Sequence, residues 1–121
     1  PERTWLLCKG APEAIMPLLE QVPDGYEATY ISNMAQGYRV LALATRLLSS
    51  STSVGDMKKA GRDSLESRLV FAGFAVLDCP LKRDSLEVVT MLQQSLHKVM
   101  MITGDGPLTA ANVADRLDMM P

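Results

Sequence analysis

Several residue types are scarce in this 121-residue sequence, and each scarcity disfavours a class of protein. The two cysteines, Cys8 and Cys79, lie far apart with no second cysteine or histidine near either, which disfavours a zinc site and a disulfide framework. His97 is the only histidine, so no convincing Ser–His–Asp or Cys–His catalytic arrangement can be built. The longest apolar run, residues 69–77, is much shorter than the roughly 18–20 residues of a membrane-spanning helix.

Charge of one sign and aromatic side chains are also in short supply. Twelve basic and fourteen acidic residues give a net charge of −2, and aromatic residues make up 5% of the chain. We therefore expect no nucleic-acid partner, because such a partner needs a basic surface or a stacking platform. The remaining composition, 47% hydrophobic and 21% charged, is that of one soluble globular domain. The chain begins at Pro1 without a methionine and ends at Pro121, so we expect a piece of a longer protein.

Apolar spacing predicts an α/β order of strand, helix, helix, strand, helix, strand up to Asp78. The expected strands are residues 4–8, 38–45 and 69–77, and the run of serine and threonine at 49–53 predicts a surface loop. Three helices are expected. Pro12 opens the first, whose apolar face is Ile15, Leu18, Leu19 and Val22. The second has an apolar face of Tyr30, Ile31, Met34 and Ala35 and ends at Gly37, and the third covers residues 54–65.

The remaining residues predict a second arrangement, helix, strand, helix. Asp84 or Ser85 should cap the first helix, whose inward face is Val88, Val89, Leu92 and Leu96. Residues 99–102 are the predicted strand, and Pro107 opens a last helix with a face of Ala110, Val113, Ala114 and Leu117. A proline and a change of charge near residues 79–82 indicate a connection between two bodies.

The segment with the strongest chemical signal is the loop of residues 103–107, which joins the predicted strand to the last helix. In an open α/β sheet such a junction presents free backbone N–H groups and a helix N-terminus to anions, above all phosphates. Thr103 adds a hydroxyl, Gly104 allows close approach of a ligand, and Asp105 could hold Mg²⁺ or a water beside a phosphate. A plain turn with a capping aspartate explains the same residues equally well.

Two cationic side chains are further candidates for a phosphate or nucleotide site. Lys9 and Gly10 end a predicted strand just before a helix, where the lysine could reach a phosphate or the edge of a base. Arg39, shortly after Gly37, could offer a bidentate guanidinium to a phosphate. A solvated lysine beside a turn and a surface ion pair are the alternative interpretations.

Four segments together resemble the ATP-handling region of P-type ATPases, the ion and lipid pumps that pass through a phospho-aspartate. They occur in the family's order and span nearly the whole chain: Lys9-Gly10-Ala11-Pro12-Glu13, then Gly37-Tyr38-Arg39-Val40-Leu41-Ala42-Leu43-Ala44, then Phe71-Ala72-Gly73-Phe74 leading to Pro80-Leu81-Lys82, and finally Met101-Ile102-Thr103-Gly104-Asp105-Gly106-Pro107-Leu108-Thr109-Ala110.

The resemblance implies a division of the chain and a role for each candidate residue. Residues 1–78 would be the C-terminal part of the nucleotide-binding (N) domain, 79–83 a hinge, and 84–121 part of a phosphorylation (P) domain with a haloacid-dehalogenase-like Rossmann sheet. Lys9 and Gly10 would line the nucleotide pocket and Arg39 would reach the phosphates of ATP. Thr103, Gly104 and Asp105 would lie beside the γ-phosphate, and no residue is expected to form a metal site within this chain alone.

Two positions depart from the family pattern. The usual hinge sequence Asp-Pro-x-Arg is replaced by Cys79-Pro80-Leu81-Lys82, which looks most like the endoplasmic-reticulum branch of the type V subclass. That branch is linked to the handling of membrane-protein helices rather than of a simple ion. Gly106 stands where the family more often has asparagine, and the loss of that amide should remove a helix cap.

The resemblance also implies what lies outside this chain. The family's phosphorylated aspartate, in Asp-Lys-Thr-Gly-Thr, and its Thr-Gly-Asp-Gly-x-Asn-Asp loop are not in the sequence. We therefore expect ATP and Mg²⁺ to act with the actuator, transmembrane and remaining N and P domains of a longer ATPase, on the cytosolic face of the endoplasmic reticulum. The fragment alone should be inactive.

Two other functions compete with the ATPase fragment. The phosphate-type loops would also suit a non-catalytic nucleotide-binding or interaction module of a soluble protein. A free-standing haloacid-dehalogenase-like phosphatase is disfavoured, because the paired aspartates that such an enzyme carries on its first strand have no counterpart here.

Overall fold

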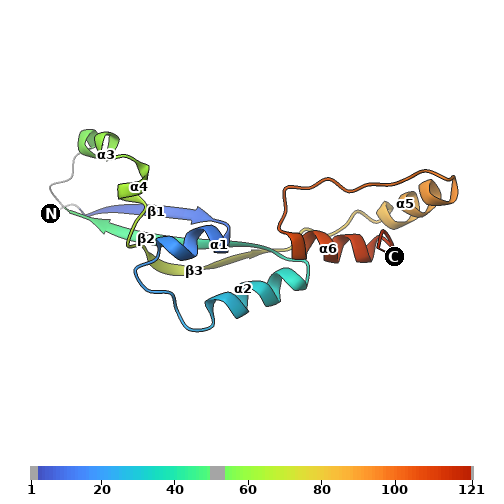
Figure 1. Ribbon diagram of the computed structural model, residues 1–121, viewed down its shortest axis with the longest axis horizontal. Coiled ribbons are helices and arrows are strands. Elements are labelled where there is room, and N and C mark those ends of the chain that lie inside the picture. The colour runs from blue at the N-terminus through green and yellow to red at the C-terminus, as the bar shows by residue number, and fades with distance from the viewer. Residues whose placement is uncertain (1–2, 50–53, 121) are drawn as a thin grey trace. The chain divides into compact units, whose positions relative to one another are not determined.

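The computed structural model describes residues 3–49 and 54–120, which belong to two units (Figure 1). The first unit consists of Pro1–Glu27 with Val40–Ala75, and the second of Ala28–Arg39 with Val76–Pro121. Each unit therefore joins two segments that are distant in the sequence. Most of the predicted loop at 49–53 lies outside the described residues.

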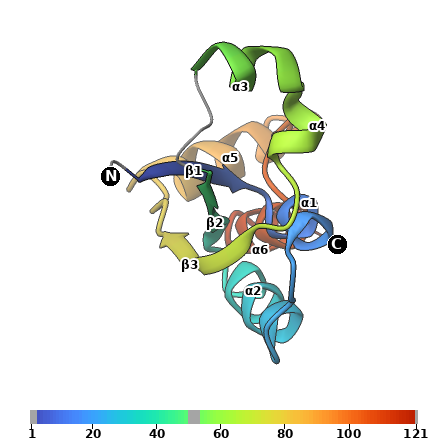
Figure 2. The same cartoon turned by 90° about the vertical axis from the view of Figure 1, so that its left-hand side faces the viewer.

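A three-stranded sheet is the centre of the first unit (Figure 2). Its strands are β1 (Thr4–Gly10), β2 (Arg39–Leu48) and β3 (Val70–Leu77), in the order β1-β2-β3. The first two are antiparallel and in register from Thr4 opposite Leu48 to Gly10 opposite Ala42. The expected α/β class is thus confirmed, in the form of helices around a small sheet.

The two faces of the sheet differ in burial, as alternation along a strand requires. Ala42, Ala44 and Leu48 point to one face and are at most 8% exposed. Trp5 and Leu7 point to the other face and are 53% and 75% exposed. The core of this unit therefore lies on one face of the sheet, and the second face is open.

Helices of the first unit are shorter than the sequence predicts, because single residues interrupt them. The helix opened by Pro12 consists of α1 (Pro12–Ile15) and a 3₁₀ turn, η1 (Met16–Leu18), and does not continue to Val22. Pro17 is the physical reason, since proline lacks the N–H that a longer α-helix needs. The single helix predicted for residues 54–65 is two, α3 (Val54–Ala60) and α4 (Arg62–Leu65), because Gly61 adopts a positive φ of 75° between them.

An aromatic cluster holds the start of α2 (Tyr26–Ala35) within the first unit. The ring of Tyr26, which is 3% exposed, lies 5.0 Å from the ring of Phe71 and 4.8 Å from that of Phe74. The Tyr26 hydroxyl donates a hydrogen bond of 2.9 Å to the buried carbonyl oxygen of Pro12. Tyr26 therefore contacts both β3 and the beginning of α1.

The second unit contains the rest of α2 together with α5 (Ser85–Gln94) and α6 (Pro107–Arg116). Its buried side chains come from the end of α2 and from the last helix, and they are Tyr30, Met34, Thr109, Ala114 and Leu117. The predicted inward positions of Tyr30, Met34, Ala114 and Leu117 are confirmed. Ile31, predicted on the same face as Tyr30, is 40% exposed.

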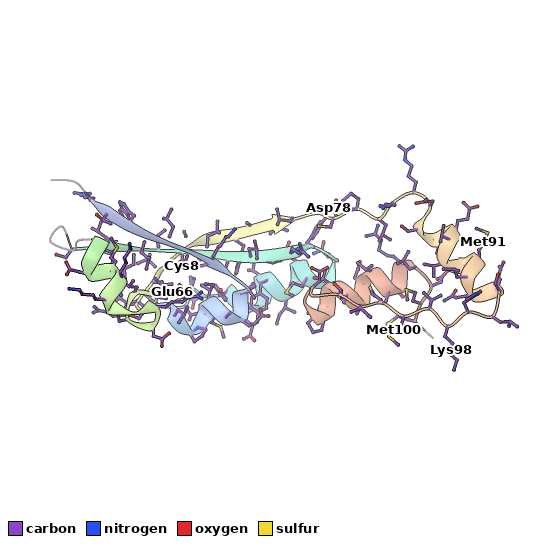
Figure 3. All side chains as sticks on the ribbon, turned by 90° about the horizontal axis from the view of Figure 1, so that it is seen from above. Cys8, Glu66, Asp78, Met91, Lys98 and Met100 are labelled. Carbon is purple, nitrogen blue, oxygen red and sulfur yellow. The ribbon has the colours of Figure 1, made fainter. Side chains whose placement is uncertain are left out.

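The strand predicted at residues 99–102 is wrong: these residues have no regular secondary structure. A strand needs a neighbour for its backbone hydrogen bonds, and no described residue supplies one. Met100 and Ile102 are 80% and 90% exposed, and Figure 3 shows Met100 on this segment, with Lys98 just before it.

The inward face predicted for α5 is also wrong: Val88, Leu92 and Leu96 are exposed, Val89 is partly exposed, and no residue of the helix is buried. An apolar helix face is buried only where another element packs on it, and no described element covers this one. None of the described helices is long and apolar enough to cross a membrane.

Tyr26→Phe should destabilise the fold by about 0.5–1.5 kcal/mol, because the buried carbonyl of Pro12 loses the Tyr26 hydroxyl and keeps only the backbone N–H of Met16 as a donor. Urea unfolding followed by circular dichroism measures the change. Tyr38→Phe is the matched control, since the Tyr38 hydroxyl makes no hydrogen bond with a described residue. Equal stability of the Tyr26→Phe variant and the wild type would contradict the role assigned to this hydrogen bond.

Candidate functional site

Arg39 and Asp105, 66 positions apart in the sequence, form an ion pair in the second unit. Arg39 is the first residue of β2, and Asp105 lies in the loop before α6. The Arg39 Nε donates to Asp105 Oδ1 at 2.8 Å, and Nη2 donates to the same oxygen. The Arg39 side chain remains 52% exposed, so a ligand can still reach it.

The loop at residues 103–105 is organised around the same carboxylate. Thr103 Oγ1 donates to Asp105 Oδ2 at 3.1 Å, and the Asp105 backbone N–H donates to Thr103 Oγ1 at 3.1 Å. A side chain added at Gly104 would meet no atom within 4 Å. The loop is therefore locally ordered and open above Gly104.

The simple capping interpretation of this loop does not hold. Gly106 is the N-cap residue of α6, and no side chain makes a capping hydrogen bond there. Asp105 is instead occupied by Arg39 and Thr103. A Cβ at position 106 would collide with the terminal methyl group of Met34, which fills the space beside this glycine.

The ion pair favours the charged form of both partners. Its hydrogen bond to Arg39 is the main reason that the pKa of the Asp105 carboxyl is lowered from the ordinary 3.8, and the Thr103 hydroxyl adds to the effect. The hydrogen bond to Asp105 likewise raises the pKa of Arg39, with a small further contribution from the nearby Cys79. The lowered pKa of Asp105 and the raised pKa of Arg39 both favour the charged forms, so both side chains are charged at neutral pH.

Lys9 and Gly10 lie in the first unit, at the end of β1. Lys9 is exposed and directly opposite Leu43 of β2, which is 37% exposed, so an ammonium group and an apolar side chain share the open face of the sheet. A Cβ on Gly10 would approach Ile15 at 3.3 Å, which shows that the glycine lets α1 pack close to the strand.

The structure therefore brings together four of the six predicted site residues: Arg39, Thr103, Gly104 and Asp105 belong to one unit, and Lys9 and Gly10 to the other. Among residues 3–49 and 54–120, no group of three or more His, Cys, Asp or Glu side chains could hold a metal ion. The residues predicted to form a hinge, 79–83, form neither helix nor strand.

Two polar residues of α6 were missed by the sequence analysis. Thr109 is 5% exposed and donates from Oγ1 to the carbonyl oxygen of Tyr38 at 2.9 Å. Asn112 donates from Nδ2 to the carbonyl oxygen of Ala35 at 3.1 Å. Thr109 lies four residues before Val113 of the predicted apolar face, whereas Asn112 lies off that face, so the apolar pattern of the helix indicates neither residue.

Comparisons with curated proteins give matches over nearly the whole chain, whereas no family model matches. The endoplasmic reticulum transmembrane helix translocase of Aspergillus fumigatus is 44% identical over 119 residues, which are 97% of this chain and 9% of the relative. The corresponding translocase of Schizosaccharomyces pombe is 42% identical over 118 residues, 98% of the chain and 10% of the relative. The probable manganese-transporting ATPase PDR2 of Arabidopsis thaliana is 46% identical over 112 residues, 93% of the chain and 9% of the relative.

The chain therefore belongs to the P-type ATPases, as the four sequence motifs indicated. Within that family it is a fragment of the type V branch, which contains the helix translocases. It spans about a tenth of the length of the relatives that it matches.

Acid should weaken the Arg39–Asp105 pair. Because folding lowers the pKa of Asp105 below the ordinary 3.8, its stabilising effect is complete above that value and is lost as the pH falls below it. Urea unfolding at a series of pH values should show this acid-sensitive part, and Asp105→Asn should remove it. The control is Asp115→Asn, which removes an exposed carboxylate that has no ion pair with a described residue. Identical acid profiles for Asp105→Asn and the wild type would contradict the role of the pair.

Gly37→Ala should cost more stability than Gly25→Ala. Both glycines have a positive φ, of 90° and 74°, so alanine is strained at each by about 1 kcal/mol or more. Only at Gly37 would the new Cβ also meet a side chain, the Cγ of Asn112 at 2.9 Å. Unfolding experiments should show that adding Asn112→Ala recovers this extra loss. Equal costs at the two glycines would show that Asn112 does not crowd Gly37.

Proposed function

We propose that this chain is the part of a type V P-type ATPase that binds ATP and positions its γ-phosphate for transfer to an aspartate outside the chain. The observation that carries the proposal is the Arg39 guanidinium, which is hydrogen-bonded at the Thr103–Asp105 loop and belongs to a side chain that is 52% exposed. A cation beside a hydroxyl and an open glycine backbone is suited to a polyphosphate. Family membership supports the same assignment.

The phosphate end of ATP can be held without breaking the ion pair. Only the Nε and Nη2 atoms of Arg39 donate to Asp105, so the remaining guanidinium N–H groups can donate to phosphate oxygens. Thr103 is exposed and Gly104 is open, which lets a phosphate approach the backbone of the loop. Bound Mg²⁺ would neutralise phosphate charge, and Asp105 is the carboxylate of this loop that could hold it or its water.

The nucleoside end is assigned to the open face of the sheet. A flat base can lie on an apolar side chain such as Leu43 while the Lys9 ammonium group contacts its edge or a phosphate. Trp5, Leu7 and Leu43 are exposed on this face and could contact a base. Gly10 contributes by allowing α1 to pack against the end of β1.

We assign residues 1–78 to the N domain, 79–83 to the hinge and 84–121 to a part of the haloacid-dehalogenase-like P domain. The aspartate that accepts the phosphoryl group would come from the remaining P domain, so the isolated fragment should not hydrolyse ATP. In the whole protein, phosphorylation and hydrolysis at that aspartate would drive transport by the membrane domain. We place the whole protein in the endoplasmic reticulum with this segment on the cytosolic side, as the named helix translocases suggest.

Lys9→Ala and Arg39→Ala should each weaken ATP binding by the full-length protein about tenfold or more, because each removes a charge-assisted contact. The dissociation constant for a fluorescent ATP analogue measures the effect. Lys59→Ala and Arg68→Ala, which remove exposed cations elsewhere, are the matched controls and should leave binding unchanged. Wild-type ATP affinity in both the Lys9 and the Arg39 variant would remove these residues from the site.

Asp105→Asn should instead reduce formation of the phosphoenzyme more than it reduces nucleotide binding.

A further inference from the structure

The segment that presents Arg39 is fastened to α6 by two side-chain hydrogen bonds. Thr109 Oγ1 donates to the Tyr38 carbonyl at 2.9 Å, and Asn112 Nδ2 donates to the Ala35 carbonyl at 3.1 Å. The two donors are three residues apart and so lie on one face of the helix. Both hydrogen bonds lie within the second unit and fall just before Arg39.

These hydrogen bonds complete the C-terminal end of α2. The last carbonyl groups of a helix have no partner within the helix, and a glycine with positive φ commonly turns the chain there. Here the backbone N–H of Gly37 donates to the Met34 carbonyl at 2.9 Å and that of Tyr38 to the Asn33 carbonyl at 3.2 Å. The Ala35 carbonyl is instead satisfied from outside, by α6.

The position of Asn112 is set by close fit as well as by hydrogen bonding. Its side chain lies over Gly37, where an added Cβ would be 2.9 Å from its Cγ atom. Its Oδ1 atom is buried and has no hydrogen-bond partner among the described residues, so the amide is retained at the cost of one unsatisfied acceptor. The Nδ2 donor is thus the only polar function of this side chain that the structure shows in use.

We infer that Thr109 and Asn112 are positioning residues that fix the Ala35–Tyr38 turn on α6 and thereby set where the Arg39 guanidinium stands at the Thr103–Asp105 loop. Neither side chain would touch ATP. They act through Arg39, and in that respect the inference rests on the proposed function. Loss of either donor should let the turn open locally. Arg39 would then change position, although both side chains of its ion pair with Asp105 are still present.

The first test measures the turn directly and needs no nucleotide. In the full-length protein, Thr109→Val and Asn112→Ala should each speed amide hydrogen exchange of a peptide covering residues 36–40, by about two- to tenfold, the range for one neutral hydrogen bond. Thr109→Ser keeps the hydroxyl and should retain the wild-type rate. Thr90→Val is the matched control, since Thr90 Oγ1 makes the same kind of bond, 2.8 Å to the Leu86 carbonyl, within its own helix. Unchanged exchange in both α6 variants would overturn the inference.

The second test asks whether the two residues act through Arg39. Thr109→Val should weaken ATP binding by about two- to tenfold in the wild-type background and by nothing further in the Arg39→Ala background, because contacts that work through one group are not additive. Equal effects of Thr109→Val in the two backgrounds would overturn the positioning role even if exchange at the turn had increased.

Failure of the inference can be distinguished from failure of the proposed function. Wild-type ATP affinity in the Arg39→Ala protein would contradict the nucleotide site, whereas the exchange measurement would still decide whether Thr109 and Asn112 fix the turn. Weakened binding in Arg39→Ala together with wild-type binding in Thr109→Val would leave the nucleotide site intact and overturn the positioning role alone.

Discussion

The ion pair between Arg39 and Asp105 is the interaction on which the candidate site depends. It joins the first residue of β2 to the loop before α6 across 66 positions of sequence, and it holds a guanidinium beside a threonine hydroxyl and an open glycine. An exposed ion pair contributes little stability by itself. The ion pair therefore matters because it positions the Arg39 guanidinium. The neutral hydrogen bonds from Thr109 and Asn112 hold the turn just before Arg39.

Charge balance explains how one arginine can serve both an aspartate and a nucleotide. In the proposed site Asp105 would keep Arg39 near the loop before the ligand arrives, while the exposed part of the Arg39 side chain would stay available to phosphate. Asp105 would repel phosphate by itself, so its pairing with Arg39 and a bound Mg²⁺ would be needed for both groups to face the same polyphosphate. The same arrangement accounts for the expectation that Asp105→Asn disturbs phosphoryl transfer more than binding.

The sequence predicted those helix ends and strands that depend mainly on neighbouring residues, such as prolines, glycines and short apolar runs. Pro107 opens α6, Gly37 follows the end of α2, and the three strands expected before residue 78 are found as β1, β2 and β3. The sequence also contains Pro17 and Gly61, which interrupt the helices. The prediction followed the apolar spacing around them and therefore made both helices too long. The strand at residues 99–102 was predicted from a correct apolar pattern, yet a strand forms only with a hydrogen-bonded neighbour. The motifs indicated Arg39 and Asp105 as phosphate residues, whereas their mutual pairing and the roles of Thr109 and Asn112 depend on contacts between distant segments.

The most direct test of the account is a cryo-electron-microscopy structure of the full-length protein with a non-hydrolysable ATP analogue and Mg²⁺. The account predicts phosphate oxygens within hydrogen-bonding distance of the Arg39 guanidinium and the Thr103–Asp105 loop, with the base against Leu43 and Lys9. A bound analogue that contacts neither Arg39 nor Lys9, with Arg39 engaged by Asp105 alone, would contradict it.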